Sequence, residues 1–154
     1  MPATEGHPAP ALDLPTDGGG RVSLDALKGR PAVVYFYPKD DTTGCTREAQ
    51  DFTALAADFA GLGVPVIGVS KDTVKKHDRF KAKYDLAVTL ASDEDGAVCE
   101  AWGVWVEKTL YGRQYMGIER ATFLIDRDGV VRRVWRKVKV PGHAQEVLSV
   151  AQSL

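Results

Sequence analysis

The chain has 154 residues, of which 44% are hydrophobic and 27% charged, and its formal net charge is -1. These values are typical of a globular protein with a substantial core, so we expect residues 1–154 to form a single domain. A charge near zero argues against a nucleic-acid-binding protein or one that binds a membrane surface, and no apolar stretch approaches the roughly 18 residues that would cross a bilayer.

The cysteine content indicates the compartment. Two cysteines are too few for the disulfide framework of a small secreted protein, and no C-x-x-C pair occurs. The first seven residues lack the basic start and the apolar middle of a signal peptide. The sequence therefore predicts a cytoplasmic protein.

The N-terminal third predicts a hairpin, a strand and a helix. Short extended pieces at 11–14 and 21–23 flank a turn at Gly18-Gly19-Gly20 and are typical of a hairpin. The apolar run at 32–37 lies between two prolines, which is the pattern of a strand buried on both faces. From Cys45 to Leu62, hydrophobic residues recur every three or four positions, so we expect one amphipathic helix.

The middle of the chain continues the alternation. We expect a second buried strand at 64–70, a helix capped by Asp72 that extends to about Tyr84, and a short strand at 88–90. Ser92-Asp93-Glu94-Asp95 then has the spacing of a capping box, and the helix that it opens carries Cys99.

The C-terminal part predicts a hairpin and a last helix. The segment 111–115 is expected to turn, and strands at 121–125 and 130–135 flank an Asp-Gly turn. A helix follows from about Ala144. Strands that alternate with helices and end in a hairpin indicate an α/β fold, a mixed central sheet flanked by helices, in which chemistry gathers beyond the carboxyl ends of the strands.

Cys45 lies at that end of the strand predicted at 32–37, at the start of a helix. Unpaired N–H groups and the positive end of the helix dipole favour a thiolate there. Thr42 is close enough for its hydroxyl to reach the sulfur or a bound oxygen, and Gly44 leaves backbone N–H groups free to point at an anion. Pro38 has no N–H and can shield the pocket from water.

Arg120 is the fifth candidate, because it begins the buried strand predicted at 121–125. An arginine in that position is costly unless it pairs with an anion, which the thiolate would provide. A surface ion pair with Glu119 or Asp126 remains an alternative. Glu48 is left out of the site, since a favourable charge at a helix N-terminus is enough to explain it.

The spacing Pro38-x-x-x-Thr42-x-x-Cys45 resembles the active-site motif of the peroxiredoxins. The surrounding residues, and the segments at 92–95, 103–105 and 120–126, resemble the bacterioferritin-comigratory or peroxiredoxin Q subfamily. The resemblance implies a thioredoxin-like fold and a thiol peroxidase of hydrogen peroxide and organic hydroperoxides. It also implies that Cys45 is the peroxidatic cysteine and that Thr42 hydrogen-bonds the peroxide. Arg120 would stabilise the thiolate and the leaving oxygen at this substrate site, and Pro38 would shield the pocket.

The chain departs from this pattern in its second cysteine. Many members carry a resolving cysteine five positions after the first, and others carry one near 79–81, but this chain has Gln50 and no cysteine at either place. Cys99 is expected to be a buried core residue. We therefore expect a one-cysteine cycle in which thioredoxin, glutaredoxin or a small thiol reduces the sulfenic acid. A two-cysteine cycle with Cys99 as the resolving residue, and a chaperone-like protein with a vestigial site, are the alternatives.

Other features have simpler interpretations. His7, His77 and His143 show no metal-binding spacing, so neither a metal site nor a cofactor is expected. The basic segment 132–139 alternates with apolar residues and is interpreted as a strand with one charged face rather than a nucleic-acid site. The subfamily resemblance implies a monomer.

Overall fold

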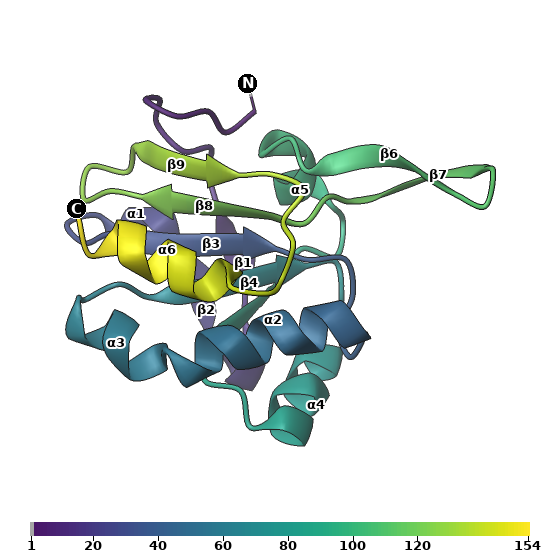
Figure 1. Ribbon diagram of the computed structural model, residues 1–154, viewed down its shortest axis with the longest axis horizontal. Helices are drawn as coiled ribbons and strands as arrows, with labels where there is room; N and C mark the ends of the chain where they lie inside the picture. Colours follow the sequence, from purple (N-terminus) through teal and green to yellow (C-terminus); the bar gives the residue numbers. More distant parts are fainter. Residues whose placement is uncertain (1) are drawn as a thin grey trace.

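A five-stranded mixed sheet lies at the centre of the computed structural model, which describes residues 2–154 (Figure 1). Its strands lie in the order β5-β4-β3-β8-β9. β3 (Ala32–Phe36), β4 (Val66–Ser70) and β5 (Thr89–Ser92) are parallel to one another. β8 (Ala121–Ile125) is antiparallel to β3, and β9 (Val131–Trp135) is antiparallel to β8. The predicted α/β fold with a mixed central sheet is confirmed.

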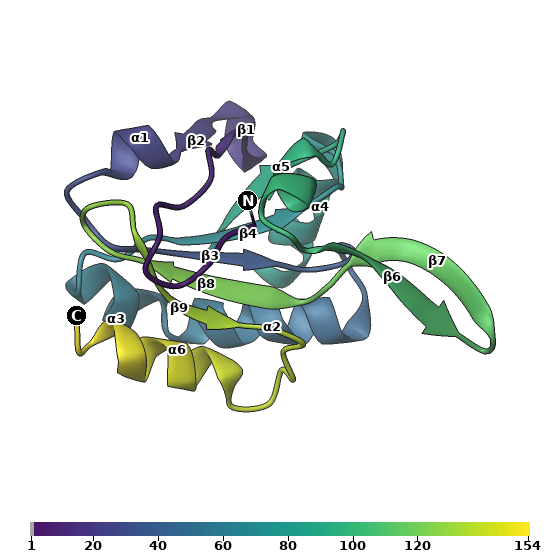
Figure 2. The same cartoon turned by 90° about the horizontal axis from the view of Figure 1, so that it is seen from above.

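Three helices cover one face of this sheet: α2 (Thr43–Ala54), α3 (Ala56–Gly61) and α6 (His143–Ala151) (Figure 2). Their buried side chains, such as Phe52 and Val147, form one core with the residues of β3 that point to that face. The strand is buried on both sides, as its continuous apolar run predicts.

The opposite face is covered by the N-terminal segment and α5 (Ala97–Ala101) (Figure 2). The predicted hairpin is present there as β1 (Asp13–Pro15) and β2 (Arg21–Ser23), with the short 3-10 helix η1 (Asp17–Gly19) in its turn and α1 (Leu24–Leu27) after it. This layer forms a second core that includes Cys99.

Two elements lie at the periphery. α4 (Val74–Tyr84) packs beside β5 and η1 at the edge of the sheet. The hairpin of β6 (Trp105–Leu110) and β7 (Arg113–Ile118) projects from the body (Figures 1 and 2). Its turn is at Tyr111 and Gly112, so the turn predicted at 111–115 is shorter than expected and its last three residues belong to β7. None of the helices in residues 2–154 combines the length and the apolar character needed to cross a bilayer.

The prediction of one helix from Cys45 to Leu62 is wrong. The helix begins two residues earlier, and Leu55, at φ -102° and ψ 10°, separates α2 from α3. The N–H of Leu55 bonds the carbonyl of Phe52 at 3.1 Å, three residues back, which tightens the last turn of α2. The regular spacing hides this break because Phe52 and Phe59 still reach the same core.

Two predicted caps are also wrong. Thr73 caps α4 by accepting the N–H of Lys76 at 3.1 Å, because the Asp72 carboxylate is already bonded to Ser70. Ser92 does not cap α5; its hydroxyl donates to the carbonyl of Asp72. The carboxylate that follows it, Asp93, accepts the N–H groups of Val98 and Cys99 at 3.2 and 2.8 Å and holds the start of α5.

Candidate active site

Cys45 lies in the first turn of α2, just beyond the end of β3. Thr42 is the N-cap residue by its backbone, and its carbonyl accepts the N–H of Thr46 at 2.8 Å, but its side chain makes no cap hydrogen bond. The first N–H groups of α2 therefore have no acceptor within the helix. Only 2% of Cys45 is exposed, so the positive end of the helix adjoins a thiol that is shielded from water.

Arg120 reaches this thiol from the neighbouring strand. The register of β3 and β8 pairs Phe36 with Ala121, which brings the residue before β8 to the end of β3. One guanidinium nitrogen, Nη2, donates to Sγ of Cys45 at 3.4 Å. Burial by itself would lower the pKa of Arg120, but the charges of Glu48 and Cys45 outweigh it and raise the pKa. The guanidinium thus keeps its positive charge beside the sulfur.

Glu48 completes this arrangement, and the sequence analysis misses it. Its Oε1 accepts from Nη1 of Arg120 at 2.7 Å, and only 1% of the residue is exposed. Burial raises the pKa of Glu48 to about 7, although Arg120 opposes the shift. Oε2 has no hydrogen-bond partner within residues 2–154. The sequence did carry one signal for Glu48: a residue three positions after Cys45 in a helix lies on the same face as Cys45.

The alternative of a surface ion pair for Arg120 is wrong. Glu119 pairs with Arg136 at 3.4 Å, and Asp126 pairs with Arg132 at 3.7 Å. Neither acid is within salt-bridge distance of Arg120 in the described chain, whose recorded partners are Glu48 and Cys45.

The remaining predicted residues surround the start of α2. A Cβ on Gly44 would lie 3.2 Å from Nη2 of Arg120, so the glycine leaves the space that the guanidinium occupies. The hydroxyl of Thr42 donates to the carbonyl of Lys39 at 2.9 Å, and the side chain is exposed. Pro38 is exposed at the end of β3. All three lie within seven residues of Cys45 in the loop and first turn.

Cys99 lies on the other side of the sheet. Cys45 packs in the core shared by α2 and α6, whereas Cys99 packs in the core on the opposite face and is fully buried. Both thiols are free. Burial, assisted by the carboxylate of Asp93, raises the pKa of Cys99 well above its ordinary value. The expectation of a buried core residue is confirmed.

Known proteins resemble this chain over most of its length. A sequence model of the AhpC/TSA family matches residues 6–134. A putative peroxiredoxin bcp from Coxiella burnetii is 54% identical over 143 residues, which cover 93% of this chain and 95% of that protein. Peroxiredoxin Bcp from Bacillus subtilis is 46% identical, with 97% of this chain and 95% of the relative covered.

Solved structures show the same likeness. The PrxQ of Xylella fastidiosa superposes with a TM-score of 0.93 at 38% identity, covering 99% of this chain and 98% of its own. The bacterioferritin comigratory protein of Xanthomonas campestris, studied for alkyl peroxide reduction, superposes with a TM-score of 0.88 at 48% identity, covering 92% and 90%. The thioredoxin-like fold is thereby confirmed. The chain belongs to the AhpC/TSA family and, within it, to the Bcp or peroxiredoxin Q group of thiol-dependent peroxidases.

Proposed function

We propose that this peroxidase reduces hydrogen peroxide and organic hydroperoxides with Cys45 as the attacking thiolate. The observation that carries the proposal is the single guanidinium of Arg120, which bonds Sγ with one nitrogen and the buried Glu48 with another. The guanidinium is held in place by a carboxylate before substrate arrives, so little reorganisation is needed when charge moves in the reaction. Organic hydroperoxides are included because the Xanthomonas relative was studied for alkyl peroxide reduction.

In the first step the Cys45 thiolate attacks the oxygen of the hydroperoxide that carries the proton. An S–O bond forms, the O–O bond breaks, and its electron pair leaves on the second oxygen as an alkoxide or hydroxide, which takes a proton from water. The sulfur becomes a sulfenic acid. The negative charge moves from sulfur to the leaving oxygen, and Arg120 is adjacent to the path of that charge.

Three further residues have roles in binding. The hydroxyl hydrogen of Thr42 is used on Lys39, so its oxygen is left to accept the O–H of the peroxide. Gly44 keeps the space for the guanidinium and leaves backbone N–H groups at the helix start for an anionic oxygen. Pro38 closes the end of β3 without adding a donor that would hold water.

We infer that an external thiol completes the cycle. Cys99 belongs to the core on the far face of the sheet, and a disulfide needs Cα atoms within about 7 Å of each other. A reductant thiol attacks the sulfenic sulfur, an S–S bond forms and water leaves, after which a second thiol releases Cys45. Thioredoxin, glutaredoxin with glutathione, or another small thiol fits this role, and the cycle requires the reducing conditions of the cytoplasm. We propose that the enzyme acts as a monomer.

Two serine substitutions test the assignment. Cys45→Ser should abolish peroxide consumption while the fold remains intact, because serine is not a nucleophile at neutral pH without an activating base. Cys99→Ser is the matched control and should retain turnover with an external thiol. Consumption by the Cys45 variant would refute the peroxidatic role. Loss of turnover in the Cys99 variant, together with an intramolecular disulfide in the oxidised parent, would establish the two-cysteine cycle instead.

A further inference from the structure

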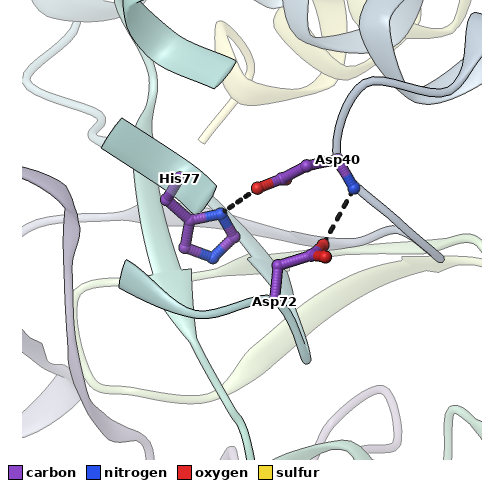
Figure 3. Close-up of side chains that lie close together, drawn as sticks. All are labelled: Asp40, Asp72 and His77. Carbon is purple, nitrogen blue, oxygen red and sulfur yellow. Dashed lines mark hydrogen bonds and ion pairs between the residues drawn. The ribbon is translucent and has the colours of Figure 1, made fainter. Parts of the chain in front are cut away.

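A buried cluster of Asp40, Asp72 and His77 joins the loop that leads to Cys45 to the start of α4 (Figure 3). Nδ1 of His77 bonds Oδ2 of Asp40 at 2.6 Å, and Nε2 bonds the carbonyl oxygen of Ala91 at 2.9 Å. A carbonyl only accepts hydrogen bonds, so Nε2 carries a proton. The imidazole is fully buried and is held at both nitrogens.

The distances identify this cluster as a hydrogen-bonded clamp rather than a metal site. Two ligand atoms each about 2.1 Å from an ion, at right angles, would lie about 3 Å apart. Nδ1 and Oδ2 are closer than that. Oδ2 of Asp72 in turn accepts from the hydroxyl of Ser70 at 2.7 Å and from the backbone N–H of Asp40 at 2.8 Å. The nitrogen and oxygen atoms that could bind a metal ion are thus hydrogen-bonded within the protein instead.

Asp40 is the centre of the clamp. It lies midway in the loop that joins β3 to α2. Oδ1 of its carboxylate accepts from the hydroxyl of Tyr37 at 2.5 Å, and Oδ2 is hydrogen-bonded to Nδ1 of His77. Its backbone N–H donates to Asp72. Figure 3 shows hydrogen bonds from Asp40 to each of the other two residues of the cluster. The loop is therefore fixed at this residue to Tyr37, which directly follows β3, to α4 and to the segment that precedes α4.

The next residue, Asp41, is held by side chains of α4. Asp41 has a φ of 61°, a left-handed conformation that few residues other than glycine adopt. Its carboxylate accepts from Nζ of Lys83 at 2.8 Å and from the hydroxyl of Tyr84 at 2.6 Å, both on α4. Thr42, the N-cap residue of α2, follows directly. Two consecutive aspartates thus hold the backbone that presents Thr42 and, three residues later, Cys45.

We propose that His77 is a positioning residue for peroxide reduction: by holding the Asp40 carboxylate, it fixes the loop and the start of α2 in the arrangement that receives the substrate. The inference rests on the proposed function of Cys45 and adds to it a residue from α4. A displacement of about 1 Å in a reacting group can cost a factor of about 100 in rate, so a clamp two residues from Thr42 bears on the chemistry without touching the substrate.

Two amide substitutions separate positioning from general stability. In His77→Asn the side-chain nitrogen takes the place of Nδ1, so the bond to Asp40 is kept and the bond to Ala91 is lost. In His77→Gln the nitrogen takes the place of Nε2, so the bond to Ala91 is kept and the bond to Asp40 is lost. Each variant loses one buried hydrogen bond. A merely structural role would lower the stability in urea without slowing the peroxide step of the folded fraction.

The measurement is the second-order rate of the first peroxide-dependent step, by stopped flow, with urea unfolding of both variants to correct for unfolded protein. The glutamine variant should be slower than the parent by about tenfold or more, and the asparagine variant should stay within about threefold of the parent. A rate for asparagine more than threefold above that for glutamine supports the proposal, and any smaller or opposite ratio overturns it. The Cys45→Ser result is independent of this ratio, so failure of the positioning role and failure of the proposed function are distinguishable.

Discussion

Substituting Glu48 by glutamine should change how the stability of the protein depends on pH. Burial raises the pKa of Glu48 from 4.5 to about 7. The folded state therefore binds this proton more tightly than the unfolded state, and stability falls as pH rises from about 4.5 to about 7. The difference of 2.5 pKa units (7 - 4.5) corresponds to about 3 kcal/mol. Glutamine does not titrate, and its amide oxygen can still accept from Arg120, so the variant loses this pH dependence.

The assay is urea unfolding at a series of pH values from 4.5 to 7.5. The free energy of unfolding of Glu48→Gln, less that of the parent, should rise by about 3 kcal/mol across this range. Glu107→Gln serves as the control, since it removes an exposed carboxylate on β6. If the Glu48 variant and the parent give parallel curves, the carboxylate ionises in the folded state as freely as in water, and the reasoning about its burial is refuted.

Two further predictions concern Arg120 and His143, an ionised and a neutral side chain. Arg120→Met should slow the peroxide step, measured by stopped flow, by a factor of about 10² to 10³, as loss of an oxyanion donor does. The control Arg136→Met, at a more exposed ion pair, should change the rate less than about threefold. A threefold effect or less in the Arg120 variant would contradict its role. Burial lowers the pKa of His143 to about 4, so the folded state disfavours its proton and stability is lost as pH falls from about 6.5 to about 4. Between pH 6.5 and about pH 4, the free energy of unfolding in urea should fall by about 3 kcal/mol less in His143→Gln than in the parent. An equal fall in both proteins would count against a buried neutral imidazole.

Much of the fold could be predicted because it depends on local patterns. The continuous apolar run that became β3 and the Asp-Gly turn between β8 and β9 are signals carried by neighbouring residues. The break at Leu55 could not be predicted, since both halves of the interrupted helix keep the same hydrophobic spacing. The predicted caps of α4 and α5 were wrong because several polar residues near each helix start could cap it. Tertiary hydrogen bonds engage some of these residues and decide which one is free to cap.

The site divides in the same way. The motif around Cys45 lies within eight residues, so the sequence could predict that these residues gather between a strand and the start of a helix, as they do. The bond between Arg120 and Glu48 spans 72 residues, and that between His77 and Asp40 spans 37. Neither pairing leaves a periodic signal. Glu48 had a sufficient local explanation as a helix charge, and only the folded chain shows that its carboxylate is buried.

The separation of Cys45 and Arg120 has a consequence for biosynthesis. They are 75 positions apart, and they meet only through the antiparallel pairing of β3 with β8. At a translation rate of about 5–20 residues per second, the cysteine leaves the ribosome about 4–15 s before the arginine. Nascent chains therefore contain a thiol that lacks its guanidinium partner until β8 has paired with β3.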